Sequence, residues 1–166
     1  MTRFRRLLVA GVGAASLVVM GVSSASADDG GSLVEFHSMT PITGSAVGAV
    51  NDRGLKGGGL PWAITSGKGE VSRHGGVEVR VTGLVLVATG ANPIGSFAAT
   101  VSCVTPSGIV NVTTGQFPAS STGDSRIEDT VSLPRHCRQP EVFVGAVLGG
   151  QFRWFAVSNA EEDDDD

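Results

Sequence analysis

The two cysteines of this chain, Cys103 and Cys137, delimit a segment that begins and ends with strand-like alternation. In residues 97–104 and again in residues 126–133, apolar side chains recur at alternate positions, with Asp129 as the exception. A period of two is typical of a β-strand that buries one face. A disulfide between Cys103 and Cys137 would therefore join two parts of one β core.

The disulfide is favoured by the cysteine count and by the compartment that the N-terminus predicts. The chain has two cysteines in all, and an exported chain is expected to oxidise them together. Closing a loop of about 35 residues stabilises a fold by roughly 3–4 kcal/mol in the chain-entropy model. The alternative is a catalytic Cys137 thiol activated by His136, but neighbouring residues on an extended chain point in opposite directions.

Residues 1–27 have the layout of a secretory signal peptide. A basic start is followed by an apolar stretch over residues 7–22 and by an Ala-Ser-Ala cleavage site at residues 25–27. The alternative is an uncleaved N-terminal anchor. We expect a secreted or cell-envelope associated product, with a single domain over residues 28–160 and an acidic, solvated tail over residues 161–166.

The charge of the mature chain is concentrated at its ends. Without the signal peptide, nine basic residues stand against sixteen acidic ones, a net charge of −7. Six of the acids form the tail, and Asp28 and Asp29 lie at the other end, so the body is nearly neutral. A nearly neutral body argues against nucleic acid, which needs a clustered basic surface, and against an anionic membrane surface. The tail could serve a cation or a basic partner.

Short strands separated by Gly and Pro turns predict an all-β fold. The strongest strand signal is residues 77–88, where Gly83 marks an expected bulge or bend. Two closing strands over residues 141–148 and 151–158 are joined by Gly149-Gly150. Apolar residues nowhere recur at helical spacing in the mature chain. The sequence therefore predicts an antiparallel β-sandwich, immunoglobulin-like or jelly-roll-like, with a barrel as the alternative.

Other local expectations concern the first half of the domain. We expect a first strand over residues 33–39 and a short strand over residues 44–50. Turns are expected over residues 51–54, at Gly67-Lys68-Gly69 and at Gly75-Gly76. Pro lacks the amide donor that a central strand needs, so Pro61 predicts an edge strand over residues 60–64.

A set of short motifs resembles small secreted actinobacterial proteins of unknown function. That family carries no known activity, so the resemblance implies no site. Enediyne-carrier apoproteins are also small secreted sandwiches, but they have two disulfides and share no motif with this chain. The motifs of the resemblance are residues 59–62 (GLPW), 83–86 (GLVL), 101–103 (VSC), 122–124 (TGD), 133–137 (LPRHC) and 154–157 (WFAV).

No catalytic, metal or cofactor motif is present in the sequence. His37, His74 and His136 lack the spacing of a metal site, and Asp124, Glu128 and Asp129 lack the glycine-spaced loop that binds calcium. Nucleophile elbows and nucleotide-binding loops are missing. We expect no cofactor and no metal. A hydrolase with an unrecognised site stays open, and it would need Asp129 or Glu35 in a cleft with a histidine.

The two tryptophans are the remaining ligand-binding candidates. Trp62 follows Pro61 on an expected edge strand, and Trp154 shares a strand face with Phe152 while Phe155 points the other way. Core packing is the commoner fate of such large aromatics. A carbohydrate or small-ligand site would instead leave Trp62 or Trp154 exposed, beside a pocket.

Taken together, these patterns favour a secreted, non-catalytic binding module that meets its partner through loops or a sheet edge. The partner is expected to be an extracellular protein, a glycan or a small ligand. The alternatives are the tryptophan-based ligand site and the unrecognised hydrolase. No membrane span is expected after signal cleavage.

Overall fold

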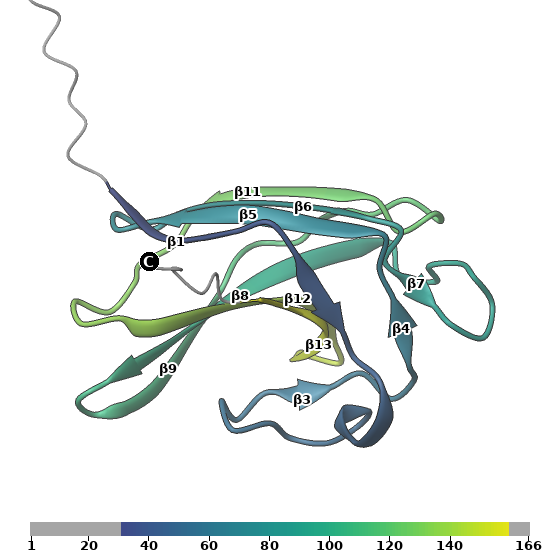
Figure 1. The fold of residues 1–166 in the computed structure, drawn as a ribbon, viewed down its shortest axis with the longest axis horizontal. Coiled ribbons are helices and arrows are strands. Elements are labelled where there is room, and N and C mark those ends of the chain that lie inside the picture. Colours follow the sequence, from purple (N-terminus) through teal and green to yellow (C-terminus); the bar gives the residue numbers. More distant parts are fainter. Residues whose placement is uncertain (1–30, 160–166) are drawn as a thin grey trace, which may run out of the picture.

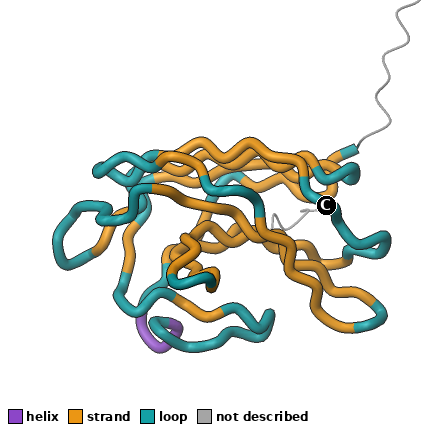
Figure 2. The backbone as a smooth tube through the Cα atoms, turned by 180° about the vertical axis from the view of Figure 1, so that it is seen from behind, coloured by secondary structure: helices purple, strands orange, loops and turns teal. Residues whose placement is uncertain are grey.

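The computed structural model describes residues 31–159, in which two large β-sheets pack face to face and a third, two-stranded sheet stands at one end (Figure 1). The strand pairs are antiparallel except one short parallel contact between β3 and β13. The helical content of the described residues is one three-residue turn, η1 (Gly44–Ala46), drawn in purple in Figure 2. The expected fold class, an all-β antiparallel sandwich with one disulfide, is confirmed.

The first layer is a four-stranded sheet in the order β1-β5-β6-β11, the upper layer of Figure 1. Alternation sets its two faces: Val77, Val79 and Val81 are buried, whereas Glu78 and Arg80 between them are exposed. Its strands are β1 (Ser32–Phe36), β5 (Ser66–Ser72), β6 (Gly76–Thr82) and β11 (Ser125–Thr130).

The second layer is a larger sheet built around β8 and β12, in the order β10-β8-β12-β13-β2, with β9 beside β8 and β3 beside β13. Residues 97–103 of β8 are all buried, so this strand is covered on both faces. One face packs on the first sheet. Residues 43–61, here named the covering segment, join the edge of the larger sheet through β3, which pairs with β13, and contact β9 and β12 through Arg53. The strands are β2 (Met39–Pro41), β3 (Lys56–Gly57), β8 (Ser96–Thr105), β9 (Gly108–Thr113), β10 (Phe117–Pro118), β12 (Arg138–Leu148) and β13 (Gln151–Ser158).

A two-stranded sheet of β4 (Trp62–Ala63) and β7 (Val85–Leu86) stands at one end of the sandwich. The expected long strand over residues 77–88 is therefore two strands. Gly83 has φ +64°, and its amide donates to the carboxylate of Asp124, which turns the chain out of the first sheet. The predicted bend at Gly83 is present, and the strand ends there.

Two other local predictions were wrong. Residues 67–69 are part of β5 rather than a turn, because these glycines let the core approach the strand. A Cβ at Gly67 would lie 2.6 Å from Met39 Cγ, and one at Gly69 would lie 2.8 Å from Phe36 Cζ. Residues 44–50, expected as a strand, contain η1 and a turn at the start of the covering segment.

The disulfide joins Cys103 on β8 to Cys137, with sulfur atoms 2.01 Å apart. Cys137 ends the crossover of residues 131–137, which carries the chain from β11 in one sheet to β12 in the other. The bond therefore ties this crossover to the central strand of the larger sheet. Because both sulfurs are in the bond, the alternative of a catalytic Cys137 thiol does not apply to this structure.

The predicted signal peptide, residues 1–27, and the predicted tail, residues 161–166, lie outside the described residues. Among the residues that are described, no helix has the length and apolar character needed to cross a membrane.

Candidate functional site

Trp62 is buried at the loop end of the sandwich, where β4 pairs with β7. Its backbone amide donates to the carbonyl of Ile42, 3.0 Å away, and its register partner on β7 is Leu86. The preceding Pro61 has no amide hydrogen, but its carbonyl accepts from Val87. The edge strand expected over residues 60–64 is therefore shorter, the two-residue strand β4, which pairs with β7.

The indole of Trp62 is only 3% exposed because two phenyl rings enclose it. It stacks on Phe155 with ring centroids 4.1 Å apart, and it meets Phe97 edge-on at 6.3 Å. Phe97 and Phe155 also meet edge-on at 6.1 Å. Offset-stacked and edge-to-face contacts are the arrangements that aromatic quadrupoles favour. These three rings form the aromatic cluster at the loop end of the sandwich.

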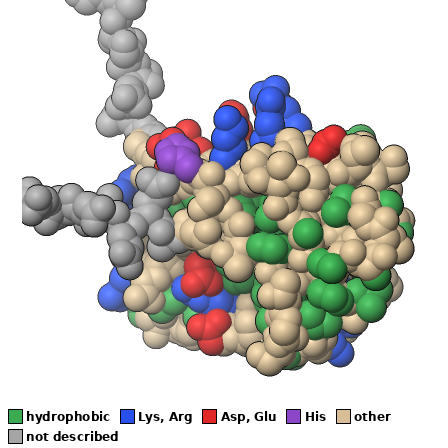
Figure 3. All heavy atoms as spheres, turned by 45° about the vertical axis from the view of Figure 1, so that its right-hand side comes forward, with side chains coloured by type: hydrophobic (Ala, Val, Ile, Leu, Met, Phe, Trp, Pro, Cys, Tyr) green, Lys and Arg blue, Asp and Glu red, His purple; other side chains and the backbone are tan. Residues whose placement is uncertain are grey.

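An apolar groove of about 220 Å³ opens beside Trp62. Its walls come from segments far apart in the sequence: the glycine run before β4, the β7 turn, the loop before β8 and the β12–β13 hairpin. Figure 3 shows the hydrophobic side chains that gather on this side of the molecule. The lining residues are Gly58, Gly59, Leu60, Trp62, Leu86, Pro93, Ile94, Leu148, Arg153 and Phe155.

The apolar surface continues beyond the groove. Leu60 is 53% exposed, Val87 57% and Leu148 43%, and each belongs to one of the segments that form the groove. Single exposed apolar residues are ordinary, but a cluster around a hollow marks a site of interaction in soluble proteins. This end of the sandwich is therefore the best candidate for a binding surface.

Two adjacent glycines, Gly58 and Gly59, line the groove, and they differ in the space that surrounds them. A Cβ at Gly58 would lie 2.9 Å from Phe155 Cδ1 and 3.3 Å from Trp62 Nε1, so Gly58 lets the backbone lie against the aromatic cluster. A Cβ at Gly59 would meet nothing within 4 Å. Gly59 therefore leaves open space where a side chain would otherwise project.

Arg153 is the one charged residue among those that line the groove. It is on β13, and one of its guanidinium nitrogens, Nη2, donates to Oε1 of Gln151 at 2.9 Å. A guanidinium has five N–H donors in a planar fork and pairs well with a carboxylate. The rim of the groove thus provides a cationic contact beside an apolar hollow.

Trp154, the second candidate, lies on the other face of β13 from Phe155. Its ring meets Phe143 edge-on at 5.7 Å, and the residue is 7% exposed. The indole Nε1 is buried without a hydrogen-bond partner among the described residues. The structure therefore does not join Trp62 and Trp154 in one site. Neither indole presents the exposed ring face that a sugar-binding platform uses.

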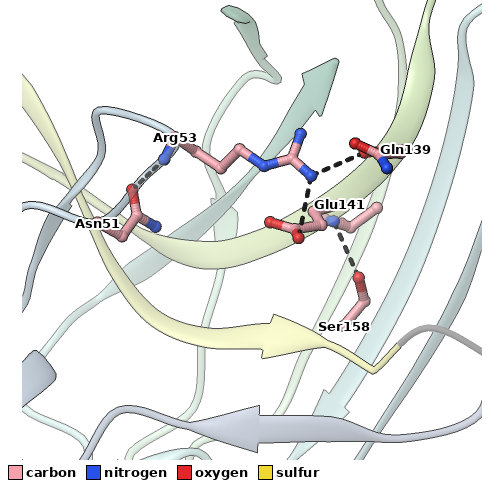
Figure 4. Close-up of polar contacts among 6 residues, drawn as sticks. Asn51, Arg53, Gln139, Glu141 and Ser158 are labelled. Carbon is pink, nitrogen blue, oxygen red and sulfur yellow. Dashed lines mark hydrogen bonds and ion pairs between the residues drawn. The ribbon is translucent and has the colours of Figure 1, made fainter. Parts of the chain in front are cut away.

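Arg53, which belongs to the turn predicted over residues 51–54, is buried and holds the covering segment in place (Figure 4). Arg53 is 7% exposed, and its Nη2 lies 3.0 Å from Oε1 of Glu141 and donates to the carbonyl of Gln139 at 3.0 Å. The side-chain amide of Asn111 donates to the Arg53 carbonyl at 2.8 Å, and the Asn51 side chain accepts from the Arg53 amide. These contacts fix the covering segment against β9 and β12.

The titratable candidates occupy other parts of the surface. Glu35 and His37 lie 3.8 Å apart, and both side chains are more than half exposed. Asp129 accepts hydrogen bonds from the amides of Gly115 at 2.7 Å and Thr130 at 2.8 Å. The bond from Gly115, followed by that from Thr130, lowers the pKa of Asp129 below its ordinary value of 3.8.

The remaining predicted candidates also have identified places. His74 is in the β5–β6 hairpin, and His136 is in the crossover next to the disulfide. The amide of Gly83, followed by the hydroxyl of Thr122, lowers the pKa of Asp124. No three His, Cys, Asp or Glu side chains in residues 31–159 are grouped so as to hold a metal ion.

Comparison with known protein families, curated proteins and solved structures finds no match for this chain. What the fold and the groove define is a class: a single-disulfide β-sandwich that presents an apolar groove at its loop end. We therefore infer function from the groove itself.

Proposed function

We propose that this protein is an exported, non-catalytic binding module that holds a partner protein through the apolar groove at its loop end. The observation that carries the proposal is the cluster of exposed Leu60, Val87 and Leu148 around a groove floored by Trp62. Apolar surface exposed to water is a source of binding free energy when a partner covers it.

A protein partner is favoured over a small molecule by the dimensions of the site. Pockets that enclose drug-sized ligands have volumes of roughly 300–1,000 Å³, whereas this groove has about 220 Å³. The apolar surface also continues outside the groove over Leu60, Val87 and Leu148. One apolar side chain of a partner fills the hollow, and its neighbours cover the surrounding residues, as in an anchor within a ring that excludes water.

The charge at the rim supports a partner segment that carries a carboxylate. Arg153 is placed to pair with a carboxylate beside the apolar side chain. We therefore expect a partner segment in which an aromatic or large aliphatic residue is adjacent to Asp or Glu.

Export is part of the same proposal. The signal-peptide layout of residues 1–27 supports a secreted or envelope-associated location. A disulfide between Cys103 and Cys137 is consistent with an oxidising compartment.

Synthetic peptides of about ten residues test the groove by backbone-amide NMR shifts. The probe has a central Trp next to Asp. One comparison peptide replaces the Trp with Ser, and another replaces the Asp with Lys. We expect the Trp-Asp peptide to shift the amides of Leu60, Trp62 and Leu148, and we expect the two comparison peptides to bind at least about tenfold more weakly.

A groove-filling variant and a matched surface variant control this experiment. Gly59→Leu adds a large side chain to a residue that lines the groove, where a Cβ would meet nothing within 4 Å, and should abolish peptide binding. Ile109→Ser removes an apolar side chain that is 40% exposed on β9, away from the groove lining, and should leave binding unchanged. Peptide binding that survives in Gly59→Leu would exclude the groove. Binding of the aromatic anion 8-anilinonaphthalene-1-sulfonate, lost in Gly59→Leu, with no binding of any peptide would make the groove a small-ligand site.

A further inference from the structure

The outer face of the four-stranded sheet carries its charges in two straight rows that cross the strands. In the strand register Lys68 lies opposite Arg80, and Arg80 lies opposite Arg126. Two residues further along each strand, carboxylates lie opposite carboxylates in the same way. We name these sets the basic row, Lys68, Arg80 and Arg126, and the acidic row, Glu35, Glu70, Glu78 and Glu128.

This arrangement is unfavourable within a single copy of the sheet. Side chains directly opposite on antiparallel strands have Cβ atoms about 4.5–5.5 Å apart, and like charges at that distance repel. The two rows are about 7 Å apart along the strands, so attraction between them acts over a longer distance than repulsion within each row. One within-strand ion pair, between Arg126 and Glu128, joins the rows on β11.

Both rows are open to solvent. All seven residues are exposed, and together they line a hollow of about 450 Å³ on the outer face. Blue and red side chains stand out of the upper surface in Figure 3, the side on which Figure 1 places this sheet. The inner face of the same strands is apolar and packs in the core, so the charged face is the surface of this layer that a partner can reach.

We infer that this face binds the same face of a second copy of the chain in a two-fold dimer. Two copies can face each other through a two-fold axis in the plane of the interface. If this axis runs parallel to the rows and midway between them, the rotation places each basic row over the partner's acidic row. If the axis instead runs parallel to the strands, the rotation places like charges over like charges. The pattern is therefore self-complementary in one orientation, as a symmetric dimer interface requires.

The dimer should be weak and sensitive to salt. Strands about 4.8 Å apart and about 3.3 Å per residue give a face of roughly 400 Å². This is about half of the roughly 800 Å² per partner in a standard interface. The contacts are between exposed charges, which salt screens over about 10 Å at 0.1 M. Association is expected at low salt and high protein concentration.

Sedimentation equilibrium of the full mature chain, at up to about 1 mM protein, tests the inference. Wild-type protein should dimerise in low salt, and the dissociation constant should rise by more than about tenfold in 0.3 M salt. Lys68→Glu/Arg80→Glu/Arg126→Glu makes the whole face acidic and should be monomeric. A row-swapped variant, which adds Glu70→Lys/Glu78→Lys/Glu128→Lys to those three changes, restores the complementary pattern and should dimerise again.

The row-swapped variant keeps the test decisive if the all-acidic face is too unstable to fold, because its charge balance is close to that of the wild type. A wild-type chain that stays monomeric in low salt overturns the inference. So does a row-swapped variant that stays monomeric while folded. Association that persists in high salt and is lost in Leu60→Ser would show that the apolar end makes the contact. Because the groove and the charged rows share no residue, failure of this dimer leaves the peptide-binding proposal untouched.

Discussion

The indole of Trp62 and the phenyl ring of Phe155 lie nearly parallel, with planes 13° apart and centroids separated by 4.1 Å. Phe155 is on β13, in the larger sheet, whereas Trp62 is on β4, immediately after the covering segment. This stack therefore joins the loop end to the body of the sandwich. It also forms the floor of the groove, so the stability of the domain and the shape of the groove depend on the same two rings.

Removal of the Trp62 ring should destabilise the domain strongly. Trp62→Ala leaves a cavity between Phe97 and Phe155, and truncation of a buried tryptophan costs about 3–5 kcal/mol. Trp62→Phe keeps a ring on Phe155 and should cost less. The free energy of unfolding from urea denaturation, followed by far-ultraviolet circular dichroism, measures both. Equal stability of Trp62→Ala and wild type would contradict the packing of Trp62 between Phe97 and Phe155.

The two neighbouring glycines of the groove should respond differently to the same substitution. Gly58→Ala brings a methyl group to 2.9 Å from Phe155 Cδ1, so we expect a loss of about 1–3 kcal/mol in unfolding free energy. Gly59→Ala meets no atom within 4 Å and should be neutral or slightly stabilising, because alanine reduces the entropy of the unfolded chain. Thermal unfolding of the two variants side by side makes each the control for the other.

The Arg53–Glu141 ion pair should matter for the attachment of the covering segment. Arg53→Ala leaves Glu141 without its cation and the Gln139 carbonyl without that donor, and we expect a loss of about 1–3 kcal/mol. The double variant Arg53→Met/Glu141→Leu removes both charges and should recover part of that loss. Hydrogen exchange of the Gly57 and Gly58 amides, which donate to Ala49 and Trp154, reports the segment directly.

A control for this prediction is Glu128→Gln, which alters an exposed ion pair with Arg126 and should change stability little. If Arg53→Ala and Glu128→Gln have the same small effect, Arg53 does not hold the segment.

Stability should fall in acid through Asp129, whose pKa is lowered by the amides of Gly115 and Thr130. A folded-state pKa below the ordinary value of 3.8 means that the unfolded chain takes up the proton first. The contribution of Asp129 to the free energy of unfolding is therefore fully present above the ordinary pKa of 3.8, and it is lost as the pH falls through the lower folded-state pKa. Asp129→Asn does not titrate, so its stability should change less than that of wild type between about pH 5 and about pH 2.

Unfolding free energies from denaturant titrations at several pH values test this sign. Asp124→Asn is a parallel case, because the amide of Gly83 lowers the pKa of that carboxyl in the same manner. A steeper acid loss in Asp129→Asn than in wild type would contradict the assignment.

The sequence could not predict which residues form the candidate site, because non-local packing brings its parts together. Leu60, Leu86 and Leu148 are separated by 26 and 62 positions in the chain, and nothing local indicates that they share one surface. One signal was present: past Gly83 both phases of the predicted strand are apolar, and a single packed face does not need that pattern. In the structure these additional apolar residues form β7 and the exposed Val87 beside it.

The charged rows show the same limit in another form. Alternation with the valines puts Glu78 and Arg80 on the solvent face of β6. Which residue lies opposite each of them depends on register, and a shift of one residue between strands changes every cross-strand pair. Arg53 was assigned to a turn by its neighbours Asn51 and Gly54, and its burial depends on Glu141, 88 positions away.

Three features follow from the sequence alone: the all-β character, the inward valines and the pairing of Cys103 with Cys137. Periodicity and turn residues are signals within a few neighbouring positions, and the cysteine count leaves a single possible pair. The groove, the row register and the buried arginine were decided only by tertiary structure. They depend on which distant segments meet, and that depends on how the two sheets and the covering segment pack together.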